Sequence, residues 1–152
     1  GWVMLQNLPS VVAALALCPP PGSRVLDMCA APGGKTTLLA QIMGNLGEIV
    51  ALDRSHAKVS EIRSLTGEMG ATCVEDGEGS PRPAPSFPPE YFDHILLDAP
   101  CSALGLRPRL QQQSSAAYLR QCGAAQRRLG DAAVRLLRTG GSLVYSTCTI
   151  NP

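Results

Sequence analysis

Aromatic residues are scarce in this chain of 152 residues, where tryptophan, tyrosine and phenylalanine together make up 4%. The core must therefore depend on leucine, valine, isoleucine and alanine, and a hydrophobic fraction of 45% suffices for about one domain. The apolar run Val11–Leu17 falls well short of the roughly 20 residues that cross a membrane. No basic segment precedes it, as one would in a secretory signal. We therefore expect no membrane partner.

Cysteine pairs typical of metal sites are also missing. No Cys-x-x-Cys occurs, which argues against zinc, and we expect no metal. Reduced thiols are typical of an intracellular compartment, so we expect the protein in the cytoplasm, the nucleus or an organelle. We also expect a monomer. The cysteines are Cys18, Cys29, Cys73, Cys101, Cys122 and Cys148.

The net charge is small, +1 at pH 7, but it is unevenly distributed. The segment Arg107–Arg138 holds seven arginines and a single acid, Asp131, so its net charge is +6 and the rest of the chain sums to −5. One basic segment on an otherwise neutral protein is what a local contact with nucleic-acid phosphates requires. The alternative is a solvated helix face, and charge asymmetry alone does not separate the two.

The stretch Leu26–Thr37 indicates a buried strand, a break at Pro32–Gly34 and a helix of small and apolar residues. Such a turn presents free backbone N–H groups at a helix start, which suits an anion or the polar end of a nucleotide. A P-loop would need a glycine at the position of Cys29, and no Gly-x-Gly-x-x-Gly is present. Neither common phosphate motif therefore explains the turn.

An acid ends each of the first two expected strands, Asp27 and Asp53. Asp53 follows Ile49–Leu52 and can accept hydrogen bonds from both hydroxyls of a ribose, whereas it would repel a ribose phosphate. An unphosphorylated adenosine therefore fits, and the pattern predicts S-adenosylmethionine. The alternative is a glycine turn that merely closes a βα unit.

Strands and helices alternate along the chain, which predicts a parallel α/β sheet with right-handed crossovers and helices on both faces. We expect one domain over residues 1–152, as a fragment of a longer protein, with a proline-rich surface loop at 77–90. Gly140–Gly141 would end the last helix. The expected strands are 24–28, 48–52, 71–74, 91–97 and 142–146, and the expected helices are 9–17, 35–43, 55–69 and 115–137.

Two cysteines follow expected strands, Cys101 after the fourth and Cys148 after the fifth, and strand ends of a parallel sheet share one edge. A thiol whose pKa is lowered by a helix end or a cation is a nucleophile, although cysteine is also a common buried hydrophobe. Beside a methyl donor, a thiolate can add to carbon 6 of a flipped pyrimidine, so that carbon 5 can take the methyl group. Asp98 is placed to assist at ring nitrogen 3. The spacing does not tell which thiol attacks.

Three motifs resemble those of the RNA cytosine-5 methyltransferases of the Sun/nucleolar-protein type. They are Asp-x-Cys-Ala-Ala-Pro-Gly-Gly-Lys-Thr in Leu26–Thr37, Asp-Ala-Pro-Cys-Ser in Leu97–Ser102, and Ser-Thr-Cys-Thr in Tyr145–Pro152. The likeness covers nearly the whole chain, including Gln6–Ser10. The segments near Gln6 and Arg107–Pro108 look most like the branch that modifies transfer RNA.

The resemblance implies the class I S-adenosylmethionine-dependent methyltransferase fold, which is Rossmann-like, here ending before the last two strands of the sheet. It implies methylation of carbon 5 of cytosine in RNA, with tRNA bound through Arg107–Arg138. Cys148 would be the nucleophile, Cys101 would help release the methylated RNA, and Lys35 and Asp98 would face the base. The residues that would surround the cofactor are Cys29, Ala30, Ala31, Pro32, Gly33, Gly34, Lys35, Asp53, Lys58, Asp76 and Asp98.

One position departs from the family pattern, because Ala103 stands where Cys-Ser is usually followed by glycine. If that glycine has positive φ, alanine there costs about 1 kcal/mol or more. Two further functions fit the same sequence. One is a small-molecule or protein methyltransferase with structural cysteines, and the other is a cofactor- and RNA-binding module that is catalytically impaired.

Overall fold

The computed structural model describes residues 3–76, 87–103, 105 and 115–149. Helices and strands alternate along these residues, as the sequence predicts. The helices are α1 (Leu8–Leu17), α2 (Gly34–Ile42), α3 (His56–Met69) and α4 (Ala116–Leu136). The strands are β1 (Arg24–Asp27), β2 (Glu48–Ala51), β3 (Val74–Asp76), β4 (Phe92–Asp98) and β5 (Leu137–Ser146).

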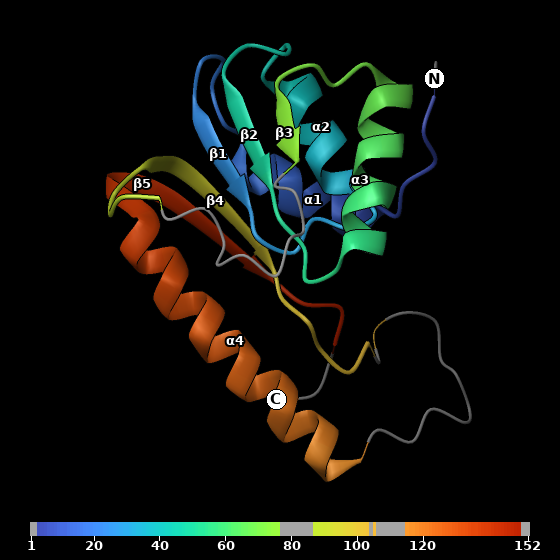
Figure 1. Cartoon of the computed structure of the whole chain (residues 1–152), viewed down its shortest axis with the longest axis vertical. Coiled ribbons are helices and arrows are strands. Elements are labelled where there is room, and N and C mark those ends of the chain that lie inside the picture. Colours follow the sequence, from blue (N-terminus) through green and yellow to red (C-terminus); the bar gives the residue numbers. More distant parts are fainter. Residues whose placement is uncertain (1–2, 77–86, 104, 106–114, 150–152) are drawn as a thin grey trace.

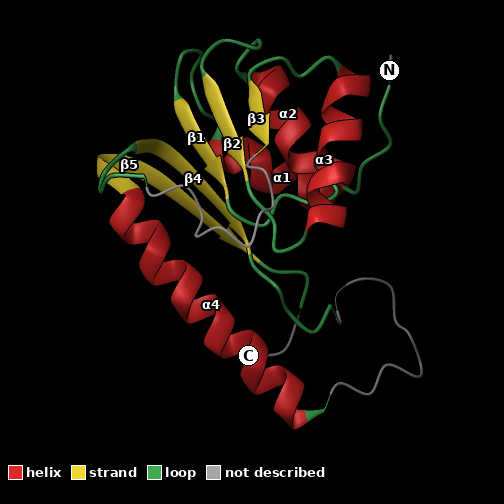
Figure 2. Cartoon of the chain, in the orientation of Figure 1, coloured by secondary structure: helices red, strands yellow, loops and turns green. Residues whose placement is uncertain are grey.

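All the described strands pair in parallel, in the order β3-β2-β1-β4-β5. The chain starts in the middle of the sheet, runs outward to β3 and returns to the other side of β1 with β4. In such sheets, ligands bind beyond the carboxyl ends of the strands where the order reverses, here between β1 and β4. Figures 1 and 2 show α1, α2 and α3 on one face of the sheet and α4 on the other.

Two apolar layers hold the sheet between these helices. Alternate residues of a strand face opposite ways, so neighbours in sequence enter different layers. Val25 and Leu96 pack on the side of α1 and α2. Leu26 and Ile95 pack on the other side with Ala133 of α4. All five are 0% exposed, which explains why these central strands are continuous apolar runs in the sequence.

The helix α3 begins and ends as its sequence predicts. Ser55 caps it by accepting a hydrogen bond from the Lys58 N–H at 3.4 Å, and Gly70 closes it with φ of 66°. Val59 and Ile62, at helical spacing, are buried. The helix is therefore positioned by its own caps and one apolar face.

The third strand was predicted three residues too early, at 71–74. Residues 71–73 form a turn after α3, because the N–H of Ala71 donates to Thr66 O and that of Thr72 to Asn45 Oδ1. The ladder with β2 therefore starts only at Val74. The predicted loop at 77–90 lies mostly outside the described residues, and its last part, 87–90, is loop and turn.

The prediction that Gly140–Gly141 ends the last helix is also wrong. The helix ends at Leu136, and both glycines lie inside β5, where an irregularity between Phe92 and His94 shifts the register. Gly140 has φ of 79°, and a Cβ on Gly141 would lie 2.5 Å from the Asp93 carbonyl oxygen. The two glycines therefore allow a bulge within the strand β5 and do not mark a helix end.

Candidate active site

The turn between β1 and α2 lies over the carboxyl end of the sheet. The N–H of Met28 donates to Leu96 O at 3.0 Å, and the N–H of Ala30 donates to Leu52 O at 2.9 Å. These bonds tie the turn to β4 and to the end of β2. Gly33 has φ of 110°, a backbone conformation that residues with a side chain rarely adopt. The break that the sequence predicts is therefore a turn that requires glycine.

Asp27, the last residue of β1, is a buried carboxyl that is only partly satisfied. Its side chain accepts a hydrogen bond at Oδ2 from Thr36 Oγ1 at 2.8 Å, while Oδ1 is buried with no partner among the described residues. Burial raises the pKa of Asp27 to about 6, although the Thr36 bond and the charge of Lys35 act in the other direction. Such an orphaned oxygen beside a cavity calls for a donor or cation from a ligand.

A cavity of about 250 Å³ lies against this turn. Its walls come from the turn, the ends of β1 and β4, and the segment that precedes α1. That segment contributes Met4, Gln6 and Asn7, which the reasoning from residues missed; the only signal was the family likeness of Gln6–Ser10. The predicted cofactor residues that line it are Cys29, Ala30, Ala31, Pro32, Gly34, Lys35 and Asp98.

Asp53 braces the turn from the neighbouring strand end. Its Oδ2 accepts a hydrogen bond from the Ala31 N–H at 3.1 Å, and its Oδ1 lies 3.5 Å from Lys58 Nζ. Asp76 ends β3 in register with Ala51, so its backbone reaches the same edge of the sheet. Among the predicted cofactor residues whose side chains the structure describes, Gly33, Asp53 and Lys58 do not line the cavity.

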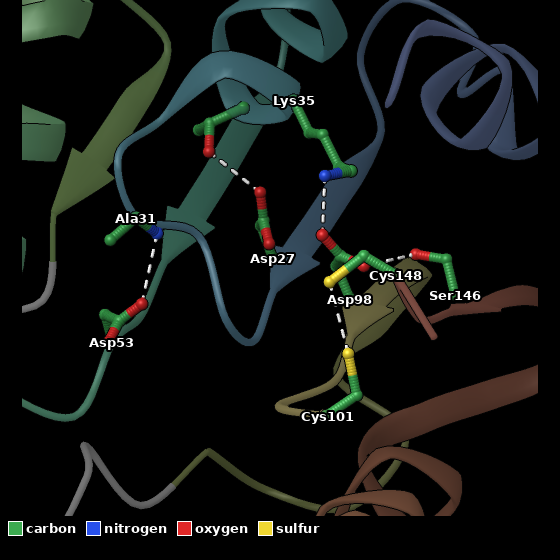
Figure 3. Close-up of polar contacts among 9 residues, drawn as sticks. Asp27, Ala31, Lys35, Asp53, Asp98, Cys101, Ser146 and Cys148 are labelled. Atoms are coloured by element: carbon green, nitrogen blue, oxygen red, sulfur yellow. Dashed lines mark hydrogen bonds and ion pairs between the residues drawn. The ribbon is translucent and has the colours of Figure 1, made fainter. Parts of the chain in front are cut away.

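An ion pair between Lys35 and Asp98 lies at the carboxyl end of the sheet, where the strand order reverses between β1 and β4. Lys35 Nζ lies 2.5 Å from Asp98 Oδ2, and Ser146 Oγ donates to Asp98 Oδ1 at 2.8 Å. Both carboxylate oxygens of Asp98 are thus held, one from α2 and the other from β5. Figure 3 shows this group beside Asp27 and the two cysteines. A cation and a carboxylate therefore sit together where the sequence predicts the target base.

Cys101 and Cys148 meet at the same edge. Their Sγ atoms lie 3.2 Å apart, and both are free thiols. Backbone bonds hold the segments that carry them together, from Ala99 N–H to Ser146 O at 3.0 Å and from Gly105 N–H to Cys148 O at 2.8 Å. The prediction that strand ends bring the two thiols to one edge is confirmed by this geometry.

The pKa of Cys148 is not lowered in this site. Burial raises it to about 11, with further contributions from the hydrogen bond to Cys101 and the negative charge of Asp98. Burial likewise raises the pKa of Cys29 to about 12, together with the charge of Asp27. The expectation of a thiol activated by a cation or a helix end is therefore wrong for Cys148. It is protonated at neutral pH and must lose its proton before it can attack.

Both the sequence and the fold of the chain resemble those of known proteins over most of its length. Residues 14–152 match the family model described as 16S rRNA methyltransferase RsmB/F. The chain belongs to this family. Its fold is the class I S-adenosylmethionine-dependent methyltransferase fold, as the resemblance implied.

Three relatives of the RsmB/F-type chain show how far the likeness extends. Human tRNA (cytosine(72)-C(5))-methyltransferase NSUN6 is 45% identical over 98% of this chain and 34% of its own length. The rRNA (cytosine-C(5))-methyltransferase NOP2C of Arabidopsis thaliana is 36% identical over 100% of this chain and 41% of its own. NSun6 from Pyrococcus horikoshii, solved with SFG, is 41% identical with a TM-score of 0.87 over 96% of this chain and 38% of its own. The chain therefore spans well under half the length of these relatives.

The basic segment of this RsmB/F-family chain is only partly placed. Arg107 and Arg109 lie outside the described residues. Arg120, Arg127 and Arg128 are exposed on α4 at i, i+7 and i+8, so they share one face of the helix. Arg138 lies in β5 and forms an ion pair with Asp93, Nε to Oδ1, at 2.7 Å. Among the described arginines, Arg138 therefore lies apart from those of α4, where Arg135 is also exposed, and Arg120, Arg127 and Arg128 form what we term the basic stripe.

The described part of the chain holds neither a membrane-spanning helix nor a cluster of metal ligands. Among those residues, no helix combines the length and the apolar character that a membrane crossing needs. No group of three or more His, Cys, Asp or Glu side chains placed to hold a metal ion occurs in the same ranges.

Proposed function

We propose that this domain methylates carbon 5 of cytosine in RNA, with S-adenosylmethionine as methyl donor and Cys148 as covalent nucleophile. The observation that carries the proposal is the pair of free thiols, Sγ to Sγ 3.2 Å, next to the Lys35–Asp98 ion pair. Transfer to an oxygen, a nitrogen or a carboxylate needs no thiol, whereas carbon 5 of a pyrimidine is too weak a nucleophile to react unaided. The pairing of two thiols with a nucleotide-type turn therefore favours this reaction.

The residues around the turn fit S-adenosylmethionine. Asp27 Oδ1, buried and without a partner among the described residues, suits the ammonium group at the amino-acid end of that molecule. Asp53, beside the turn at the end of β2, suits the ribose hydroxyls. The archaeal relative solved with SFG, an S-adenosylmethionine analogue, supports the same assignment. When bound, the cofactor supplies an electrophilic methyl group on a sulfonium.

Each side chain near the two thiols has its own role in the reaction on the base. Cys148 gives its proton to water and its sulfur bonds to carbon 6, which moves the electron pair of the 5,6 double bond to carbon 5. Lys35 and Asp98 face ring nitrogen 3 and the exocyclic amine, where they stabilise the charge that this addition moves into the ring. Once carbon 5 carries the methyl group, its proton passes to water and the Cys148 sulfur departs as a thiolate, which restores the double bond. Cys101, with its sulfur 3.2 Å from that of Cys148, takes part in this release.

The substrate we propose is tRNA, inside the cell. The human tRNA enzyme is 45% identical to this chain, against 36% for the plant rRNA enzyme, which favours the tRNA branch. The basic stripe of α4 offers exposed guanidinium groups for backbone phosphates. Extruding the target base from its stack would bring it to the edge where the thiols lie.

The test is to incubate the full-length protein with methyl-labelled S-adenosylmethionine and unfractionated RNA, then to hydrolyse the RNA and identify the labelled nucleoside. We expect 5-methylcytosine from the wild type, none from Cys148→Ala, and retained cofactor binding in that variant. Label in protein or small molecules alone would support a methyltransferase of another class. RNA binding without any transfer would support a catalytically impaired binding module. Full activity of Cys148→Ala would refute the covalent route.

A further inference from the structure

The loop that carries Cys101 is held from one side by two side chains of α4. Gln126 Nε2 donates a hydrogen bond to the carbonyl oxygen of Pro100 at 2.8 Å. Tyr118 OH donates to the carbonyl oxygen of Cys101 itself at 3.3 Å. Two successive carbonyl groups of the loop are thus bound by one helix. No element of the sequence pattern pointed to either contact, because the residues are 26 and 17 positions apart.

From the other side, the same loop is tied to the segment of Cys148. Ala99 N–H donates to Ser146 O at 3.0 Å, just before Cys101, and Gly105 N–H donates to Cys148 O at 2.8 Å, just after it. Cys101 therefore lies between two sets of restraints, one from α4 and one from β5 and its extension. Because a cysteine side chain turns about a single bond to its backbone, the backbone position sets where the sulfur can reach. Losing the α4 side would remove the restraints on Pro100 and Cys101 and keep those toward the segment of Cys148.

The helix face that reaches the loop is distinct from its basic stripe. Tyr118, Cys122 and Gln126 follow one another at i, i+4 and i+8, so they lie along one side of α4. Cys122, between the other two, is 8% exposed, which shows that this side packs against the protein. The arginines of the basic stripe are exposed on another side. The contacts to Pro100 and Cys101 thus lie at the margin of the packed side of the helix, because Tyr118 is 46% exposed and Gln126 is half-buried.

We propose that Tyr118 and Gln126 are positioning residues, which hold the Cys101 loop so that the Cys101 sulfur can act in the release of the methylated base. The proposal rests on the proposed function and on the release role of Cys101. Neither residue lines the cavity beside the β1–α2 turn, and among the described residues their bonds go to Cys101 and Pro100 rather than to Cys148, which makes the earlier bond. Loosening the loop therefore affects release more than methyl transfer. The covalent RNA adduct should then persist longer.

The experiment compares full-length wild type, Gln126→Leu and Tyr118→Phe in two regimes. With enzyme in excess over RNA, one round of methyl transfer is followed from labelled S-adenosylmethionine. With RNA in excess, repeated turnover is followed, and the covalent adduct is quantified on denaturing gels. We expect each variant to keep single-round transfer within about twofold while turnover falls about three- to tenfold, the range of one lost neutral hydrogen bond. The adduct fraction should rise toward that of Cys101→Ala.

Controls separate this role from a loss of folding. Gln121→Leu makes the same chemical change at an exposed position of α4 and should leave both rates unchanged. Tyr118→Phe removes only one oxygen atom, so it tests the idea even if Gln126→Leu folds poorly. Equal loss in both regimes, or no change in either variant, would overturn the positioning role. No 5-methylcytosine from the wild type would instead refute the proposed function itself.

Discussion

The sulfur of Cys101 lies 3.2 Å from the sulfur of Cys148, although the two residues are 47 positions apart in the chain. Neither thiol forms a disulfide, and each follows a different strand of the sheet. This contact brings the two thiols within hydrogen-bonding distance of each other. It places both proposed roles, attack and release, within reach of a single base. It also makes the pair a direct reporter of the geometry of the site.

We expect mild oxidation to join these two thiols. Treatment with diamide should form a Cys101–Cys148 disulfide, because the sulfurs need to approach only from 3.2 Å to about 2.05 Å. Methyl transfer should be lost and should return with dithiothreitol, while peptide mass spectrometry identifies the cross-linked pair. Cys101→Ser, which lacks one partner, should form no such cross-link. Wild-type protein in which both thiols still react with iodoacetamide after oxidation would contradict the geometry.

Asp27 should make stability depend on pH. Its pKa is about 6 in the folded protein against 3.8 as the reference value, so the folded state binds more protons between these values. The contribution of Asp27 to stability is therefore fully present below about pH 4 and lost as the pH rises through 6. The stability lost between low pH and pH 7 is up to about 3 kcal/mol, at about 1.36 kcal/mol for each unit of difference between the two pKa values.

The variant Asp27→Asn removes the ionisation but can still accept the Thr36 hydrogen bond. We expect it to be more stable than wild type at pH 7 and to bind S-adenosylmethionine about tenfold or more weakly, because a neutral amide pairs less well with an ammonium group. Urea unfolding between pH 4.5 and 7.5 and calorimetric titration measure the two effects. An unchanged pH slope would show that Asp27 is not buried as described, and unchanged affinity would remove it from the cofactor site.

Ala103 occupies a backbone conformation that suits glycine. Its φ is 58°, in the left-handed region, as the family pattern suggested. Ala103→Gly should therefore raise the free energy of unfolding by about 1 kcal/mol, because it removes a steric cost of that order. Ala124→Gly, at an exposed position inside α4, makes the same change and should instead lower it by about 1 kcal/mol. Urea denaturation of both variants checks this, and equal destabilisation would show that Ala103 carries no strain.

The basic stripe should bind phosphates. Replacing Arg120, Arg127 and Arg128 together by glutamine should weaken RNA binding and reduce the slope of log affinity against log salt by about 2, since each phosphate contact contributes roughly 0.7 to 0.9. Filter binding of total tRNA between 50 and 200 mM salt measures this. Arg138→Gln removes an arginine already paired with Asp93 and should leave the slope unchanged. An unaltered slope in the triple variant would favour a merely solvated helix face.

Local sequence patterns predicted most of the elements because each depends on near neighbours. The apolar runs around Leu26 and Ile95 predicted buried strands, and Ser55 and Gly70 predicted the limits of α3. The patterns failed where a distant contact decides the outcome. The glycines at 140 and 141 look like a helix end, but the Asp93 carbonyl oxygen across the ladder makes them a bulge.

The sequence by itself determined the order of strands and helices and the turn at Gly33, because these depend on the propensity and spacing of neighbouring residues. It also determined that the two thiols follow strand ends at one edge of the sheet, because parallel strands end at the same edge. Only the tertiary structure decided that the two sulfurs touch, that burial raises the pKa of Cys148, and that Asp27 keeps an oxygen without a partner among the described residues. Those properties depend on distance and on exclusion of water, which arise when segments far apart in the chain pack together.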